Sequence, residues 1–99
     1  MNKTSFGNKE VLFHLNDKPK IEILSFEKSG KTHKHRACES FVVMEGEGTI
    51  YSGEKVIPVS PGDLVTIPPE TLHWMEPKSG QVLKGFLWYH TEELSVVNG

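Results

Sequence analysis

Turn-forming residues recur along the whole chain and divide it into short β-rich segments. Pro61-Gly62 has the order that a type II turn requires, and Gly46, Gly53 and Pro68 mark further breaks. No window shows the 3.6-residue periodicity of an amphipathic helix, apart from a single turn expected at 91–94. The expected strands cover residues 11–15, 21–26, 41–44, 49–51, 56–57, 64–67, 72–75 and 82–89. Short strands joined by turns predict an all-β fold that closes into a barrel or sandwich and thereby protects its edges.

The length of 99 residues predicts a single domain, and no linker, repeat or low-complexity tract interrupts it. A chain of this size buries only about 60–65% of its unfolded surface, so its core is thin. We therefore expect a homodimer in which a second copy covers an apolar face of a sheet.

Charge and cysteine content exclude several classes of partner and compartment. The formal net charge is −2 and no long basic run is present, which argues against a nucleic-acid partner. Cys38 is the single cysteine, so no intrachain disulfide can form, as is usual in a reducing compartment. No apolar leader and no stretch of about 18 apolar residues is found, so we expect no membrane partner and a cytoplasmic location.

A group of metal-ligand residue types lies between positions 33 and 39. His33, His35 and Glu39 share one parity, and side chains of equal parity on a strand point to the same face. Residues two apart on a strand are separated by roughly 6.5–7 Å along the backbone, which lets two imidazoles lean onto one ion. On a helix, residues two apart lie on different sides. The spacing therefore favours a metal site carried by a strand, and His73 is the next histidine along the chain.

These residues resemble the two sequence motifs of a small single-domain cupin. In the first motif, covering about 30–46, the matching residues are His33, His35, Glu39 and Gly46. In the second, covering about 62–77, they are Gly62, Pro68 and His73, whereas Glu70 and Pro77 replace the usual Gly and Asn. Gly30 also lies three residues before His33, where six is usual. The resemblance implies that residues 1–99 form one cupin-type double-stranded β-helix, a jelly-roll barrel.

The same resemblance implies one divalent transition metal ion per subunit, held by His33, His35, Glu39 and His73. Imidazole suits Fe, Ni, Zn and Cu, and the carboxylate adds a hard ligand that also suits Mn, so the ligand types do not choose among these metals. Four protein ligands on a six-coordinate ion leave two positions open for water or a chelating small molecule, an arrangement typical of catalytic sites.

The remaining candidate residues are placed by parity alone. Phe41 and Met75 share the parity of Glu39 and His73 and are expected to line the pocket, whereas Met44 and Trp74 face away and suit a subunit contact. Tyr51, Glu70 and His90 are weak candidates for a general base, on position only. Parity assigns no further carboxylate to the pocket.

Two functions remain open on the sequence. The first is a metal-dependent enzyme of dioxygenase, isomerase or lyase type that acts on a small oxygenated, carboxylate or sugar-like molecule. The alternative is a non-catalytic module that binds or senses a small molecule or a metal.

Overall fold

The computed structural model describes residues 2–34 and 36–90, and within these ranges every regular element is a β-strand. The strands are β1 (Asn2–Lys3), β2 (Gly7–Leu15), β3 (Lys18–Phe26), β4 (Glu39–Glu45), β5 (Gly48–Ser52), β6 (Lys55–Val59), β7 (Leu64–Ile67), β8 (His73–Pro77) and β9 (Leu83–Tyr89). Among these residues no helix is long and apolar enough to cross a membrane. The turn expected at 91–94 lies outside the described residues.

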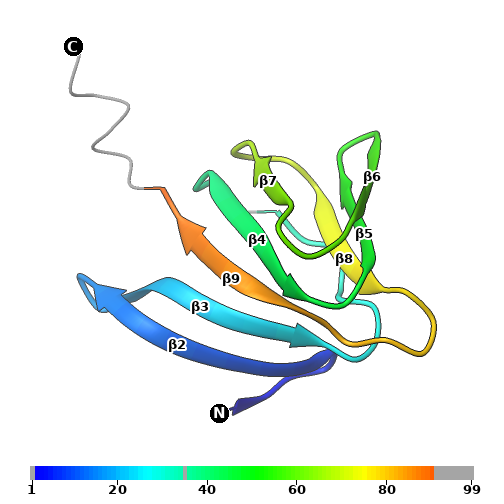
Figure 1. Cartoon of the computed structure of the whole chain (residues 1–99). Helices are drawn as coiled ribbons and strands as arrows, with labels where there is room; N and C mark the ends of the chain where they lie inside the picture. Colours follow the sequence, from blue (N-terminus) through cyan, green and yellow to red (C-terminus); the bar gives the residue numbers. More distant parts are fainter. Residues whose placement is uncertain (1, 35, 91–99) are drawn as a thin grey trace.

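The strands form two antiparallel sheets that face each other (Figure 1). The large sheet has the order β1-β2-β3-β9-β4-β7, and the small sheet has the order β6-β5-β8. The chain crosses between the sheets several times, so β4 pairs with the distant strand β9 while β5 pairs with β8. This is why residues from opposite ends of the sequence meet around one interior.

Alternating burial along each strand identifies the interior face. On β4, Phe41 and Val43 are buried, and on β9 Leu83, Gly85 and Leu87 are buried, while Val42, Lys84 and Phe86 between them face outward. The small sheet contributes Ile50 and Met75 from its own inner face. The core consists of these side chains together with Leu24, Phe26, Val59, Val65 and Ile67. Period-two burial is the pattern of a sheet with one face covered.

The segment before β4 differs from the expected strand. Among the described residues of this segment, His33 alone makes a ladder contact, as an isolated bridge with His73. Its backbone N–H donates to the His73 carbonyl at 3.1 Å, the His73 N–H donates back at 2.9 Å, and Gly30 donates to the Met75 carbonyl at 2.9 Å. Residues 30–33 therefore run along the free side of β8, which places His33 beside His73.

Two turn glycines have the conformation that the sequence predicts. Gly46 has φ 79° and Gly62 has φ 96°, both in the left-handed region that favours glycine. A Cβ atom on Gly46 would also collide with the carbonyl oxygen of Val82. Gly46 is thus required both by its φ angle and by the close approach of the chain before β9.

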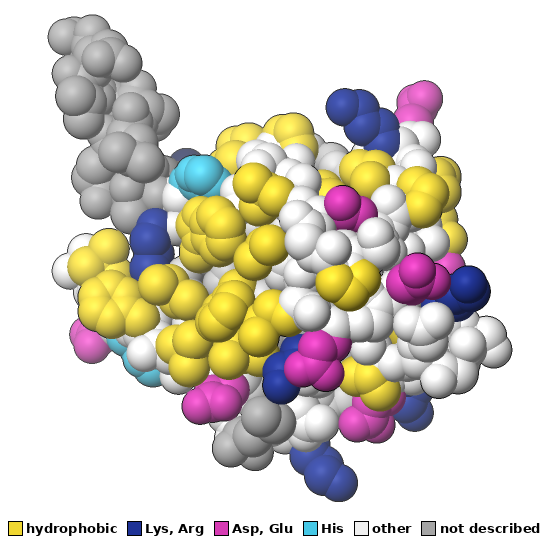
Figure 2. All heavy atoms as spheres, viewed as in Figure 1, with side chains coloured by type: hydrophobic (Ala, Val, Ile, Leu, Met, Phe, Trp, Pro, Cys, Tyr) yellow, Lys and Arg dark blue, Asp and Glu magenta, His cyan; other side chains and the backbone are white. Residues whose placement is uncertain are grey.

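The outer face of the large sheet is rich in apolar side chains. Two rows cross it, Ile21 beside Trp88, and Ile23 beside Phe86, Val42 and Leu64. Figure 2 shows hydrophobic side chains gathered over the strands of this sheet. Leu64 is 58% exposed and Phe13, opposite Ile21 on β2, is 50% exposed. We refer to Phe13, Ile21, Ile23, Val42, Leu64, Phe86 and Trp88 as the apolar outer face.

Candidate metal centre

Three side chains of the predicted site meet at one end of the barrel. Glu39 begins β4, His73 begins β8, and His33 lies on the segment paired with β8. One ligand atom from each of these residues lies within 4.8 Å of the other two. Glu39 is 2% exposed and His73 1%, whereas His33 is exposed. The group therefore opens to solvent on the His33 side. His35, the remaining predicted ligand, lies outside the described residues.

Backbone carbonyl groups orient both imidazole rings. The Nδ1 atom of His33 lies 2.8 Å from the Lys31 carbonyl oxygen, and that of His73 lies 2.8 Å from the Thr71 carbonyl oxygen. A carbonyl oxygen only accepts, so each Nδ1 must carry the hydrogen and donate it. Each ring then offers Nε2 as its ligand atom. A hydrogen bond of this kind to the second ring nitrogen is typical of metal-ligating histidines.

Glu39 and His73 form a closely spaced pair inside the barrel. Nε2 of His73 lies 3.2 Å from Oε1 of Glu39. Burial lowers the pKa of His73, but the hydrogen bond and charge of Glu39, with the Thr71 carbonyl, more than offset it and raise the pKa above 6.5. With Nδ1 already protonated, a neutral ring would point its Nε2 lone pair at a carboxylate. A proton or a metal cation between the two atoms removes that repulsion.

The donor set suits a divalent transition metal. Two imidazole nitrogens and one carboxylate oxygen are ligands that Zn, Fe, Ni and Cu accept, at roughly 2.0–2.2 Å. Neighbouring ligand atoms on one ion at these bond lengths lie about 3–3.5 Å apart. The Glu39–His73 separation of 3.2 Å already meets this, and the third ligand atom, within 4.8 Å of both, must move closer by up to about 1.5 Å. His33 is exposed, and its ring meets that of His73 edge-on at 4.2 Å, so its side chain can make that adjustment from the solvent side.

The raised pKa of His73 predicts pH dependence of opposite sign with and without metal. In the metal-free protein, the stability that the His73–Glu39 pair contributes is fully present below about pH 6.5 and is lost as pH rises through the raised pKa. A metal needs neutral imidazole, so stabilisation by Zn²⁺ grows as pH rises. We expect the melting temperature, taken relative to His73→Ala, to fall between about pH 6 and 8 in chelator-treated protein and to rise in zinc-loaded protein. The same slope in both forms would contradict this site.

Phe41 and Met75 lie directly below this group. Each follows a ligand residue by two positions on the same strand, and both are buried, at 0% and 3% exposure. Ile67, opposite Glu39 on β7, is also fully buried. An apolar floor of this kind keeps water from reaching the centre from below.

The three residues considered as general bases lie elsewhere. Tyr51 is on the outer face of the small sheet, where its ring stacks on Trp74 and its hydroxyl donates to Glu76 at 2.6 Å. Glu70 is exposed in the turn before β8 with φ 59°. Nε2 of His90 lies 2.8 Å from the Ser40 hydroxyl, and Ser40 points away from the interior that Glu39 faces. The structure does not bring any of them to the centre.

Glu22 and Tyr89 are polar interior residues that the sequence interpretation missed. Glu22 shares its face of β3 with Leu24 and Phe26 and is 4% exposed. Tyr89 ends β9 directly opposite Glu39, and its hydroxyl donates to Glu22 at 3.5 Å. The sequence does contain a signal for Glu22, because it has the same parity as the apolar residues Leu24 and Phe26 on its strand. That parity does not by itself place Glu22 in the interior, because a single strand does not reveal which of its faces is covered.

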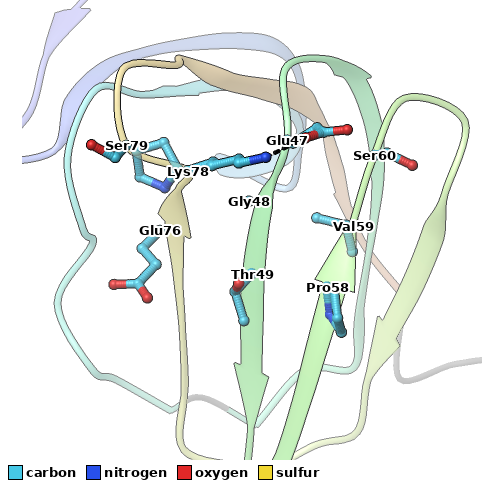
Figure 3. A pocket seen from close by; sticks show the side chains of 10 residues that line it. Glu47, Gly48, Thr49, Pro58, Val59, Ser60, Glu76, Lys78 and Ser79 are labelled. Atoms are coloured by element: carbon cyan, nitrogen blue, oxygen red, sulfur yellow. Dashed lines mark hydrogen bonds and ion pairs between the residues drawn. The ribbon is translucent and has the colours of Figure 1, made fainter.

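An open groove of about 530 Å³ lies away from this centre (Figure 3). It is lined by Gly48, Thr49, Pro58 and Val59 and closed on one side by the ion pair of Lys78 with Glu47 at 3.3 Å. Gly48 pairs with Pro77, whereas His73 pairs with Ser52 at the other end of β5. The groove and the centre are thus separated by four residue steps of a strand, roughly 13 Å.

One curated relative matches part of the chain. A gentisate 1,2-dioxygenase from Haloferax sp is 36% identical over 53 residues, which is 54% of this chain and 15% of the relative. The chain therefore spans only a small part of the length of that protein.

Solved structures match over most of the chain. A cupin 2 conserved barrel domain protein from Rhodopseudomonas palustris superimposes with a TM-score of 0.73 at 22% identity, over 84% of this chain and 59% of that one. A predicted oxalate decarboxylase from Thermotoga maritima gives a TM-score of 0.65 at 21% identity, over 70% of this chain and 63% of that one. At these identities the matches show the fold, and the chain spans less than two thirds of each.

The model of the cupin domain family matches residues 22–89, which include both motifs and every strand from β4 to β9. The prediction of an all-β, cupin-type jelly-roll barrel is confirmed by this match and by the barrel structures that superimpose on the chain. The chain belongs to the cupin domain family.

Proposed function

We propose that the chain binds one divalent transition metal ion through His33, Glu39 and His73, with His35 as a fourth ligand, and acts as a metal-dependent enzyme on a small oxygenated or carboxylate molecule. The observation that carries the proposal is the buried approach of His73 Nε2 to Glu39 Oε1 at 3.2 Å. Moving a carboxylate and an imidazole from water into the protein interior costs on the order of several kcal/mol. A proton or a metal cation bound between the two groups offsets that cost.

The side chains and backbone groups around such a site would have different roles. Glu39 and His73 are buried and fixed by the barrel, while exposed His33 leaves the approach to the centre open. The carbonyl groups of Lys31 and Thr71 hold both rings in the tautomer that presents Nε2. A bound metal supplies Lewis-acid activation of a chelated oxygen, and iron adds redox chemistry with dioxygen. The partial similarity to a gentisate dioxygenase supports a hydroxylated aromatic acid as one ligand class to test.

The alternative is a non-catalytic binding module. It is favoured by the positions of Tyr51, Glu70 and His90, all of which lie away from the centre. Oxygen uptake and product formation, measured on iron-loaded protein with hydroxybenzoates, catechols and diketones, separate the two functions. Turnover that disappears in His73→Ala supports the enzyme. Tight ligand binding without turnover across the panel supports the module.

We further propose that two copies pair through the apolar outer face. Ile21, Ile23, Phe86 and Trp88 lie at its centre, and Glu10, opposite Ile23 on β2, is the charged residue beside them. In a two-fold dimer both copies use the same surface, so one substitution changes both sides of the contact.

We expect light scattering to report twice the chain mass of 11.1 kDa, and Ile23→Glu to give a monomer. Val56→Glu, on the small sheet and 62% exposed, is the control. A monomeric native chain would exclude the dimer.

A further inference from the structure

Glu22 is a charged residue in an apolar part of the barrel. It pairs with Leu87 on β9, which in turn pairs with Phe41 on β4, so its row is one step deeper than the row of Glu39. Leu24 follows on the same face of β3. With 4% exposure, Glu22 is shielded almost as fully as these neighbours. Burying a carboxylate at this position is costly, and its contacts with neighbouring polar groups offset part of that cost.

The contacts of Glu22 connect it to the metal centre. Its Oε2 lies 4.0 Å from the ammonium nitrogen of Lys9, and its Oε1 accepts from the Tyr89 hydroxyl at 3.5 Å. Tyr89 is the cross-strand partner of Glu39, and Lys20 donates to the Tyr89 carbonyl oxygen. The Tyr89 side chain therefore lies between two carboxylates, that of Glu39 at the centre and that of Glu22 below it.

Tyr89 keeps its proton in this environment. Burial raises the pKa of its phenol, and the negative charges of Glu22 and Glu39 and the hydrogen bond to Glu22 raise it further. The wall of the barrel beside the centre thus offers one neutral hydroxyl and one carboxylate acceptor.

We propose that Glu22 and Tyr89 select the ligand of the metal centre, favouring a molecule that presents a hydroxyl group toward β3 and rejecting one that presents a second carboxylate there. This inference rests on the proposed function, because it needs a ligand chelated at His33, Glu39 and His73. A hydroxyl group can donate to the Glu22 carboxylate or exchange hydrogen bonds with Tyr89. A carboxylate at the same place has no proton to donate and meets a like charge in a poorly solvated environment.

The size of the discrimination follows from what each ligand leaves unpaired. A site built to hydrogen-bond a ligand hydroxyl group rejects analogues that leave its buried polar groups without that partner. For a hydrogen bond to a charged group, the expected ratio of dissociation constants is about tenfold to a hundredfold. A ligand with hydrogen in place of the hydroxyl group should have a dissociation constant between those of the hydroxyl ligand and the dicarboxylate.

The test uses cobalt-loaded protein and three probes with one chelating group. Salicylate, 2,5-dihydroxybenzoate and 5-carboxysalicylate all bind a metal through adjacent carboxylate and phenol oxygens, and their 5-substituent cannot reach that metal. Titration of the visible absorption of bound Co²⁺ gives each Kd, and the 4-substituted isomers are measured alongside. We expect the hydroxyl probe to bind best and the dicarboxylate worst in one of the two series, by about tenfold or more.

Two variants separate charge from hydrogen bonding. Glu22→Gln should remove the penalty on the dicarboxylate, and Tyr89→Phe should weaken the hydroxyl probe while leaving the dicarboxylate penalty in place. Glu10→Gln removes the same charge from β2 opposite Ile23, on the outer face, and should leave the order unchanged. Metal content and melting temperature are recorded for each variant.

The outcomes distinguish this inference from the function on which it rests. If salicylate binds but Glu22→Gln keeps the wild-type order, Glu22 does not act on the ligand and the selection is overturned. If no probe changes the Co²⁺ spectrum of loaded wild-type protein, chelation at this centre fails, and the inference fails with it.

Discussion

Replacement of His73 by alanine is expected to lower the affinity for Zn²⁺ by more than about 100-fold, because loss of even an outer-shell partner of a metal site costs 10–100-fold. His73 is 1% exposed and 3.2 Å from Glu39, so its removal takes away a buried ligand held beside the carboxylate. Competition with a chromophoric chelator gives the dissociation constant.

His14→Ala is the matched control for this loss. It removes a histidine that is exposed on β2, opposite Pro19 and away from the centre. Zinc affinity should be that of the native chain. Equal weakening in both variants would mean that zinc binds to histidines in general, and no effect in His73→Ala would exclude His73 as a ligand.

Replacement of Phe41 by alanine is expected to destabilise the fold by about 3–5 kcal/mol. Its side chain is fully buried, and its ring meets Phe26 edge-on at 6.4 Å and lies so close to Gly85 that a Cβ atom there would collide with it. Phe41 also lies two positions after Glu39, so the cavity would lie directly under the metal centre. Urea unfolding of metal-free protein measures the change.

Leu12→Ala serves as the control for truncation. Leu12 is 46% exposed, so its loss should change the free energy of unfolding by no more than about 0.5 kcal/mol. A cost for Phe41→Ala below about 1 kcal/mol would show that the core under the centre repacks freely.

Local periodicity accounts for the part of the site that could be predicted. Glu39 and Phe41 share one face of β4, and His73 and Met75 share one face of β8, as alternation along a strand requires. Turn residues also placed most strand ends, and Gly46 and Gly62 have the positive φ angles expected of them. These features depend on neighbours within a few residues.

The features that the sequence did not reveal depend on contacts between distant segments. Glu22 faces the interior only because β9 and β4 complete the sheet beside β3, and that order is not visible in β3 itself. His33 owes its position to pairing with His73 rather than to a regular strand of its own. Tyr89 reaches the centre because β9 pairs with β4, fifty residues earlier in the chain.

Glu22, His33 and Tyr89 bear on the proposed function, because they add a third possible ligand and two polar side chains to the pair of Glu39 and His73. His33, Glu39 and His73 are the residues that would hold an ion, and Glu22 and Tyr89 are the polar residues nearest to them on β3 and β9. Phe41 and Met75 close the floor. The proposed selectivity therefore depends on residues other than the proposed ligands, so it can fail while metal binding stands, whereas loss of metal binding removes both.

Anomalous X-ray scattering from a crystal of the zinc-loaded chain tests the metal centre most directly. The account predicts one strong peak per chain, about 2.0–2.2 Å from Nε2 of His33, Nε2 of His73 and a carboxylate oxygen of Glu39. Absence of a peak between these three residues, with zinc present in the crystal at saturating concentration, would contradict it.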